Sequence, residues 1–327
     1  MRVLVIGGTS FVGRHLVARA LAAGHELTLF NRGVTDPGLF PEAEQLRGDR
    51  DGGLGVLEGR AWDAVVDTCG YVPRVVGDSA RLLADAVERY LFVSTISVHP
   101  DDVEPGADED APLLTPPHGD GEEITDESYG PLKVACERAV ASALPDRALI
   151  VRPGLIVGPY DPTDRFTYWV RRVAAGGEVL APAPGDAPVQ FIDARDLAAF
   201  LLMHLEARTV GVFNAVAPPV PLEELLGACR TVSGSDASFT WVPEPFLRQH
   251  DVEPWSDLPM WLPQFPGANA FDPSRAMAAG LVPRTIDETV RDTLIWDRAR
   301  PQQGPMGAGL DRDRELEVLA AFRAARA

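Results

Sequence analysis

The first thirteen residues constrain what this 327-residue chain can fold into more than any other segment. Residues 1–6 are rich in Val and Leu, residues 7–13 form a glycine-rich turn, and an amphipathic segment opens at Arg14. In parallel α/β sheets, a strand followed by such a turn and a helix presents backbone N–H groups to a pyrophosphate at the helix N-terminus. We therefore expect the chain to begin with a dinucleotide-binding unit.

By itself the turn is a weak signal. Its fingerprint, Gly8-x-Ser10-x-x-Gly13, lacks the middle glycine that usually lets the backbone approach the phosphates, and a tight turn without a ligand is the alternative interpretation. The sequence that follows favours the dinucleotide site. A helix is predicted to end near Ala23, a glycine closes it, and residues 26–30 are typical of a second strand, which completes a βαβ unit.

The end of this second strand distinguishes NAD from NADP. An acidic residue there would accept hydrogen bonds from the adenosine ribose and repel a 2'-phosphate. This chain has Asn31 and Arg32 instead, and a neutral residue followed by a guanidinium suits a 2'-phosphate. We therefore expect NADP(H) to be the preferred cofactor and NAD(H) to be the alternative. The competing interpretation is that Arg32 is a solvated loop cation.

Two later segments are expected to lie near the same cofactor by their position in the chain. Asp49 and Arg50 follow a glycine in the loop that is predicted to meet the adenine. Residues 63–67 are predicted to form a strand, and Thr68 begins the run of small residues at its end. Carboxyl ends of parallel strands face the ligand in open α/β sheets, so Thr68 is expected to pass close to the cofactor.

Charge and cysteine content narrow the class of protein. The formal net charge is −18, which argues against nucleic acid as a partner. Cys69, Cys136 and Cys229 are odd in number and far apart, which fits reduced thiols and predicts neither a disulfide framework nor a metal site. No apolar run is long enough for a membrane span and no signal peptide is recognisable, so a cytoplasmic protein without a membrane partner is expected.

Strand and helix patterns alternate along the first half of the chain, which predicts an α/β fold with a doubly wound parallel sheet. The predicted elements are a helix over 72–88, a strand over 90–95, a helix over 132–144 and a strand over 148–152.

A long connection between these elements is strongly acidic and contains no Lys or Arg. Its carboxylates are Asp101, Asp102, Glu104, Asp108, Glu109, Asp110, Asp120, Glu122, Glu123, Asp126 and Glu127. Two interpretations stay open at this point: a solvated flexible loop, or a lid over an active site.

Catalytic chemistry is indicated just after this connection. Ser128 is a plausible N-cap and Pro131 is tolerated in a first helical turn, so Tyr129 and Lys133 would share one face of a helix. A phenol with a pKa of about 10 becomes a useful acid/base when an ammonium favours its phenolate. A plain surface pair is the alternative, but Thr95 adds a hydroxyl at the carboxyl end of a parallel strand.

These residues resemble the extended short-chain dehydrogenase/reductases, the NAD(P)-dependent epimerase/dehydratase family. The similar segments occur in the order and spacing of that family and reach to about Trp296. They are the glycine turn at 7–13, Ser94-Thr95, Tyr129-x-x-x-Lys133, the Arg152-Pro153-Gly154 run that continues to 159, and residues 191–198.

The resemblance implies a role for each matching residue. Tyr129 would be the catalytic acid/base, Lys133 would bind the nicotinamide ribose and lower the pKa of Tyr129, and Thr95 would hydrogen-bond the reacting oxygen. The pyrophosphate would lie on the turn formed by Gly7, Ser10, Phe11, Val12 and Gly13.

Two departures from the family pattern bear on the reaction. Ile96 and Ser97 follow Thr95 where nucleotide-sugar dehydratases carry Asp and Glu, so dehydration is disfavoured. Leu155 stands where nucleotide-sugar enzymes usually carry a substrate-binding Asn, so a sugar nucleotide is in doubt as the substrate.

Resemblance and pattern together predict a Rossmann sheet with a smaller, interleaved C-terminal substrate lobe. Residues 1–152 would form the dinucleotide-binding domain, to which 186–214 return. Residues 153–185 and 215–300 would form the lobe. Residues 301–327 would be a tail whose helix, over 311–325, packs on the body or on the second subunit of a homodimer.

Arginines in the lobe are candidates for recognising the substrate. Residues 161–165 precede a predicted helix that contains Tyr168, Trp169, Arg171 and Arg172, any of which could face a pocket over the nicotinamide, and arginines there would suit a phosphate or a carboxylate. The alternative is an ordinary amphipathic helix with solvated arginines.

We therefore expect an NAD(P)-dependent oxidoreductase or epimerase that moves a hydride between nicotinamide and a hydroxyl or keto carbon of a small molecule, with a sugar or nucleotide sugar among the substrate classes considered. The alternative from another class is a non-catalytic RNA-binding or redox-sensing member of the same fold.

Overall fold

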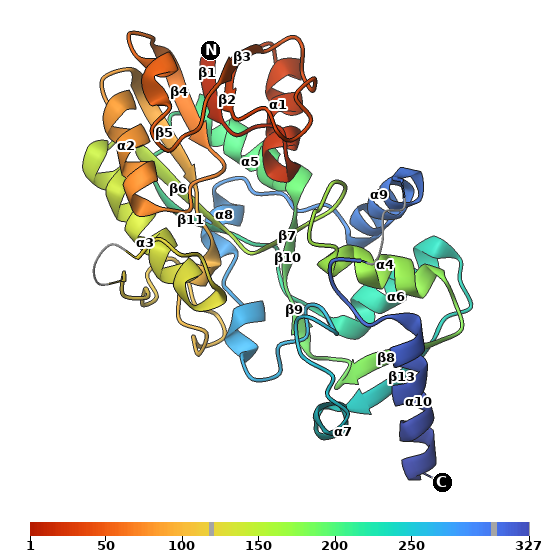
Figure 1. Cartoon of the computed structure of the whole chain (residues 1–327). Coiled ribbons are helices and arrows are strands. Elements are labelled where there is room, and N and C mark those ends of the chain that lie inside the picture. The colour runs from red at the N-terminus through yellow and green to blue at the C-terminus, as the bar shows by residue number, and fades with distance from the viewer. Residues whose placement is uncertain (118–120, 302–305, 327) are drawn as a thin grey trace.

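The computed structural model describes residues 1–117, 121–301 and 306–326 (Figure 1). The strands are β1 (Arg2–Ile6), β2 (Glu26–Asn31), β3 (Glu44–Arg47), β4 (Trp62–Asp67), β5 (Val87–Val93), β6 (Ala148–Pro153), β7 (Leu155–Val157), β8 (Glu178–Ala183), β9 (Pro188–Val189), β10 (Phe191–Asp193), β11 (Gly211–Ala215), β12 (Val220–Pro221) and β13 (Ser238–Pro243). The helices are α1 (Phe11–Ala22), α2 (Pro73–Leu83), α3 (Asp126–Ala143), α4 (Arg165–Ala174), α5 (Ala194–Glu206), α6 (Leu222–Ser233), α7 (Glu244–Gln249), α8 (Ser274–Ala278), α9 (Ile286–Ala299) and α10 (Arg312–Arg326), and three short 3-10 turns are η1 (Leu54–Leu57), η2 (Ile96–Val98) and η3 (Pro266–Asn269).

Seven strands form the central sheet in the order β11-β6-β5-β4-β1-β2-β3, and every neighbouring pair is parallel. β1 lies inside the sheet between β4 and β2, which explains why its sequence is an unbroken apolar run. The order reverses at β1 as in doubly wound folds, so the predicted α/β Rossmann sheet is confirmed. Its last strand, β11, returns from late in the chain to pair with β6.

Helices cover both faces of this sheet (Figure 1). Val3 and Val5 of β1 belong to one hydrophobic core, which α1 and α5 complete. Leu4 and Ile6 point to the opposite face and pack in a second core with α2 and α3. Because side chains alternate along a strand, one strand supplies both cores.

The helix predicted over 72–88 is too long. α2 ends at Leu83, a short turn follows, and β5 begins at Val87. Val87, the last apolar residue of the predicted helix, pairs instead with Trp62 of β4 and is buried within the sheet. Tertiary strand pairing therefore overrides the local helical periodicity.

The start of α3 also differs from the prediction. Thr125, not Ser128, is the N-cap, and Ser128 is the third helical residue of a capping box with Thr125. Pro131 consequently lies inside the helix rather than in its first turn. At Gly130, an added Cβ would come within 2.1 Å of the Ser97 carbonyl oxygen, so a glycine is required where α3 packs against η2.

A separate hydrophobic core holds the second lobe together. α4, α6, α9 and α10 pack there with the two-stranded sheet of β8 and β13. The buried side chains of Val318, Leu319 and Phe322 place α10 in this core, so the C-terminal helix packs on the body of its own chain.

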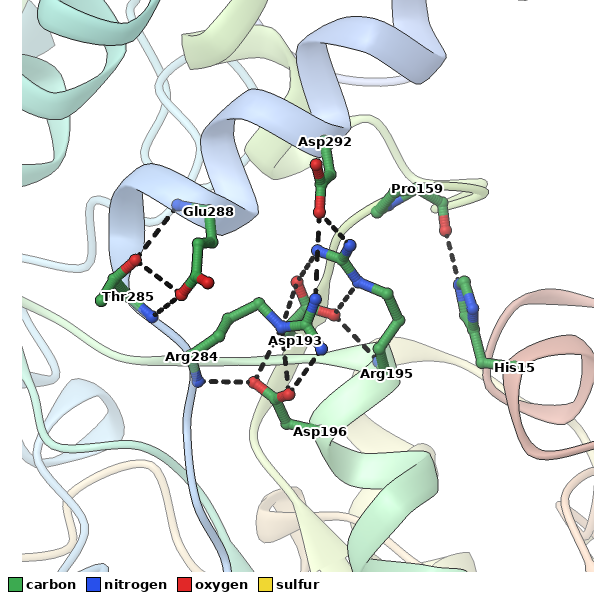
Figure 2. A network of polar contacts seen from close by, with 9 residues as sticks. All are labelled: His15, Pro159, Asp193, Arg195, Asp196, Arg284, Thr285, Glu288 and Asp292. Atoms are coloured by element: carbon green, nitrogen blue, oxygen red, sulfur yellow. Dashed lines mark hydrogen bonds and ion pairs between the residues drawn. The ribbon is translucent and has the colours of Figure 1, made fainter. Parts of the chain in front are cut away.

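An ion-pair network joins the lobe helix α9 to the end of β10 and the start of α5 (Figure 2). Arg195 binds the Asp193 carboxylate with Nε and Nη2, at 2.9 and 2.6 Å, and also pairs with Asp292 of α9. Arg284 binds Asp196 through both its backbone N–H, at 2.8 Å, and its guanidinium, at 2.7 Å. The network fixes α9 of the lobe against the end of β10 and the start of α5.

Candidate functional site

The glycine turn brings β1 and α1 into close contact. A Cβ added at Gly13 would come within 2.8 Å of Gly8 Cα, so the helix can approach the turn this closely only with glycine at that position. Ser10 is the N-cap of α1, and its side chain caps no backbone N–H. The first turn contains no acidic residue, so the positive end of the helix dipole is open to an anion.

A cavity of about 670 Å³ lies over this turn and along the carboxyl ends of the central strands. The residues predicted to bind the cofactor that line it are Gly7, Ser10, Phe11, Val12, Gly13, Asn31, Arg32, Asp49, Arg50, Thr68 and Lys133. Tyr129 and Ser94 line it as well, whereas Thr95 is not among the lining residues. The fold thus brings these residues, which come from six separate segments, to one cavity.

At the end of β2, Asn31 is held in place by the backbone. Its Nδ2 donates to the Gly7 carbonyl oxygen at 3.0 Å, and its Oδ1 accepts from the Gly33 N–H at 2.9 Å and from Arg47. Arg32 is exposed at the rim. Arg47, at the end of β3, is a second arginine in this corner that sequence reasoning did not single out, because only strand pairing places it beside Asn31.

Arg50 lines the cavity, but its guanidinium is already engaged. It binds both oxygens of the buried Asp67, at 2.7 and 2.5 Å, and donates to Ser79 Oγ at 3.0 Å. The Tyr90 hydroxyl donates to the same carboxylate at 2.9 Å. Arg50 is therefore a structural cation that can offer a ligand only the face or edge of its guanidinium.

Thr95 and Tyr129 lie together at the end of β5. Thr95 Oγ1 accepts a hydrogen bond from the Ser97 N–H at 3.1 Å, which fixes the hydroxyl at the strand end. Burial raises the pKa of Tyr129, and side-chain hydrogen bonding with Thr95 opposes this shift. The Tyr71 ring lies 6.4 Å from that of Tyr129, centroid to centroid, and shields one side of it. A protonated phenol at neutral pH follows from this environment.

Lys133 is almost fully buried one turn further along α3. Its ammonium donates to the carbonyl oxygens of Gly70 and Val93, at 2.7 and 2.8 Å, and lies 4.2 Å from the Phe92 ring centroid. Burial lowers the pKa of Lys133 to about 8. These carbonyls hold the ammonium in place. The family resemblance predicts that Lys133 lowers the pKa of Tyr129. In this structure, burial of the phenol raises the pKa of Tyr129.

Glu137 forms a buried polar group next to these residues that sequence reasoning missed. It accepts from Ser94 Oγ at 2.5 Å and from Arg152 Nε and Nη2 at 2.9 and 2.7 Å. The available signal was its spacing, since Glu137 follows Lys133 by one helical turn. It ties α3 to the ends of β5 and β6.

The acidic connection is anchored, not freely solvated, at its centre. Glu109 is buried, accepts from the Asn214 N–H at 2.7 Å and pairs with Arg275 at 3.1 Å. Glu122 lies on the surface and pairs with Arg74 at 2.7 Å. Asp120, also part of this connection, lies outside the described residues.

Neither a metal site nor a membrane-spanning helix is found among the described residues. No group of three or more His, Cys, Asp or Glu side chains is placed to hold a metal ion within the ranges that the structure describes. Within the same ranges, every helix is too short or too polar to cross a bilayer.

Comparison with known families gives one match that covers most of the chain. The sequence profile described as "NAD dependent epimerase/dehydratase family" matches residues 3–54 and 58–215. Both segments together contain the glycine turn, Thr95, Tyr129 and Lys133.

Two curated proteins are similar over part of their length. A 2'-dehydrokanamycin reductase of Streptomyces kanamyceticus is 29% identical over 240 residues, which cover 69% of this chain and 64% of the relative. The "Chloroplast stem-loop binding protein of 41 kDa b" of Arabidopsis thaliana is 27% identical over 258 residues, covering 71% and 63%. The chain thus spans just under two thirds of the length of these relatives.

Solved structures share the fold at low identity. The Bordetella bronchiseptica enzyme WbmG, solved in complex with NAD, aligns with a TM-score of 0.69 at 20% identity, covering 91% of this chain and 94% of that one. A UDP-N-acetylglucosamine 4-epimerase from Bacillus cereus aligns with a TM-score of 0.66 at 17% identity, covering 91% and 100%. At these identities the similarity establishes the fold, but neither the substrate nor the reaction.

Proposed function

Because the chain belongs to the NAD dependent epimerase/dehydratase family, we propose that it is an NADP(H)-dependent oxidoreductase that reduces the carbonyl group of a small molecule, with Tyr129 as the proton donor. Epimerisation through the same hydride chemistry is the second candidate. The observation that carries the proposal is that Tyr129 and Lys133 line the same cavity as the glycine turn at the start of α1.

The residues present fit a dinucleotide. The contact of Gly13 with Gly8 leaves the first turn of α1 open to a pyrophosphate, and neither Ser10 nor an acidic side chain occupies its N–H groups. The cavity continues from this turn to Thr68, Tyr129 and Lys133. A bound nicotinamide cofactor would supply or accept the hydride.

The chain's own residues would handle the proton and the developing charge. Tyr129 Oη would donate its proton to the substrate oxygen as the carbon is reduced, and Thr95 Oγ1 would donate a hydrogen bond to the same oxygen. A phenol whose pKa is raised is protonated at neutral pH, which suits a proton donor better than a base.

Arg32 and Arg47 support NADP(H) as the cofactor. Arg32 carries an exposed guanidinium at the cavity rim. The Arg47 side chain packs against Gly33, which is the second residue after Asn31. No carboxylate stands at the end of β2 to repel a 2'-phosphate. Two guanidinium groups in one corner would bind this phosphate by charge-assisted hydrogen bonds.

For the substrate, we propose a chemical class and no individual compound. The similarity to a 2'-dehydrokanamycin reductase suggests a ketone on a sugar-like ring as the first class to test. Leu155, which replaces the Asn typical of nucleotide-sugar enzymes, disfavours a sugar nucleotide. Ile96 and Ser97, which replace the Asp and Glu of dehydratases, disfavour elimination.

Replacement of Tyr129 tests the proposal. NADPH oxidation by the purified protein would be followed with a panel of keto sugars and simpler ketones. Tyr129→Phe keeps the ring but removes the proton, so kcat should fall by about 10²-fold or more, while NADPH affinity measured by calorimetry stays unchanged. Full turnover in this variant would contradict the assignment of Tyr129.

A non-catalytic role in RNA binding or redox sensing is the alternative. One curated relative is named as a stem-loop binding protein. The net charge of −18 opposes binding to a phosphate backbone, and Thr95, Tyr129 and Lys133 are all retained. Salt-dependent retention of the protein on immobilised RNA would support the alternative.

A further inference from the structure

Arg74, in the first turn of α2, binds two carboxylates from distant parts of the chain. Its Nη1 and Nη2 donate to the two oxygens of Asp51, at 2.7 and 2.9 Å. Its Nε and Nη2 donate to the two oxygens of Glu122, at 2.7 and 3.0 Å. One guanidinium therefore joins the loop between β3 and η1 to the end of the acidic connection. We call these three residues the Arg74 bridge.

The Arg74 bridge crosses the rim of the cofactor cavity. Asp51 lines this cavity, as do the other residues of the 48–51 loop. From the acidic connection, Ile124 lines it with a half-exposed side chain. Arg74 binds the cavity-lining Asp51 directly and is itself 49% exposed, so its guanidinium lies at the outer edge of the cavity. The bridge therefore holds two parts of the cavity wall together at the surface.

The guanidinium is what keeps these two parts together. Hydrogen bonding to Arg74 lowers the pKa of Glu122, and repulsion by the charge of Asp51 opposes this shift. If the cation were removed, two carboxylates of like charge would face each other across the rim and would favour its opening. Each carboxylate is bound through paired hydrogen bonds, which is the geometry in which an exposed ion pair has a measurable effect.

The Arg74 bridge can also open without disturbing the core. The side chains of Asp51 and Glu122 are 55% and 37% exposed, so water and salt weaken both ion pairs. The centre of the acidic connection is held differently, because the buried Glu109 accepts from the Asn214 N–H. The segment that carries Ile124 can therefore leave the rim while the centre of the connection stays in place.

We propose that the Arg74 bridge is a latch that controls how fast the dinucleotide enters and leaves the cavity. It closes the cavity beside residues 48–51, the loop expected to meet the adenine. The inference rests on the proposed function, because a reductase exchanges its oxidised cofactor for a reduced one in every turnover. It gives the end of the acidic connection a role in cofactor exchange.

Stopped-flow fluorescence of NADPH measures both exchange rates and tests the latch. Arg74→Gln should raise the rate constants for association and for dissociation by similar factors of about three to ten, because two ion pairs are lost and the carboxylates then repel. The dissociation constant should change by less than about twofold, since the latch is a barrier to exchange and not a contact of the bound cofactor. Glu122→Gln, which releases only the acidic connection, should change both rates in the same direction.

Arg81→Gln is the matched control. It makes the same charge change on the same helix, where Arg81 pairs with Asp78 on the surface and is not among the residues that line the cavity. This variant should exchange NADPH as the wild type does. Unchanged rates in Arg74→Gln would overturn the inference. A weaker affinity with an unchanged association rate would also overturn it, because Arg74 would then stabilise the bound cofactor instead of closing the cavity.

Hydrogen exchange without added cofactor separates this inference from the proposed function. The Thr125 N–H donates to Ser128 Oγ at 2.8 Å, so the end of the acidic connection contains a hydrogen-bonded amide that reports local opening. Peptides covering residues 121–128 should exchange faster in Arg74→Gln than in the wild type and in Arg81→Gln. Equal exchange in all three proteins would overturn the latch. Faster exchange in a variant whose wild type binds neither NADPH nor NADH would contradict only the proposed function.

Discussion

The nucleotide-binding half and the lobe hold their cations in different ways. Around the sheet, Lys133 binds carbonyl oxygens at the ends of neighbouring strands, and Arg50 binds Asp67 at the end of β4. In the lobe, Arg171 and Arg172 bind carboxylates that lie 126 and 143 residues further along the chain.

This difference shows which parts of the chain supply the partners of the cations in each half. The partners in the sheet come with the strands themselves, so the nucleotide-binding half is organised by the topology that makes it. The lobe needs α9 and α10 to neutralise α4, so its charges are balanced only when the C-terminal helices have packed. Arg171 and Arg172, which the sequence suggested for recognising the substrate, are engaged by these carboxylates instead.

The largest expected effect is on the stability of the lobe. Glu315→Ala would leave Arg172 buried without its carboxylate and the Leu180 N–H without its acceptor, which is 2.9 Å away. The free energy of unfolding should fall by about 3–5 kcal/mol, measured by chemical denaturation. Glu317→Ala removes a mostly exposed partner of Arg314 and should change stability by less than about 0.5 kcal/mol. Equal effects of the two substitutions would contradict the role given to α10.

The second prediction concerns Lys133 in the sheet core. Its pKa is lowered from 10.5 to about 8, so the unfolded chain binds more protons than the folded chain between these two pH values. The free energy of unfolding of the wild type should therefore rise, relative to Lys133→Met, by about 3 kcal/mol as the pH increases from 8 to 10.5. Denaturation of both proteins at the two pH values measures this. A difference that does not change with pH would show that the carbonyls fully compensate the buried charge.

A third, smaller effect separates the two cofactors at the end of β2. Arg32→Ala removes one of two guanidinium groups that would bind the 2'-phosphate. Affinity for NADPH should fall by about tenfold or more, while affinity for NADH hardly changes. Calorimetric titration with both cofactors measures the ratio. If the wild type does not distinguish them, the preference for NADP(H) is wrong although the fold is unaffected.

The smallest expected effect is at Thr95. Thr95→Val keeps the shape of the side chain and removes one hydrogen bond to the reacting oxygen. Turnover should fall by about 2–10-fold without a change in cofactor affinity. Cofactor affinity that falls in parallel with turnover would indicate that the hydroxyl only holds η2 in place, through its bond to the Ser97 N–H.

Much of the nucleotide-binding half could be predicted from the sequence. The glycine turn, the strand at 63–67 and the spacing of Tyr129 and Lys133 all correspond to structure found there. The errors occur where local pattern competes with tertiary contact. Residues up to Glu88 have a helical pattern, but β5 begins at Val87, where pairing with Trp62 of β4 brings the chain into the sheet.

Other features, all of them contacts between distant segments, could not be predicted because no sequence pattern indicated them strongly enough. Arg47 reaches Asn31 only because β3 pairs with β2, and Glu137 reaches Ser94 and Arg152 only because α3 crosses the ends of their strands. The anchoring of the acidic connection at Glu109 depends on Asn214 and Arg275, which lie more than a hundred residues away.

The sequence by itself determined the βαβ start, the placement of the glycine turn and the presence of a Tyr-Lys pair on one helix face. These features depend on backbone dihedral angles and on side-chain spacing within a few helical turns, which neighbouring residues control. Only the tertiary structure decided which charges are neutralised. Arg171 and Arg172 of α4 look alike in the sequence, but whether a guanidinium is free for a ligand depends on carboxylates that the fold brings from distant segments.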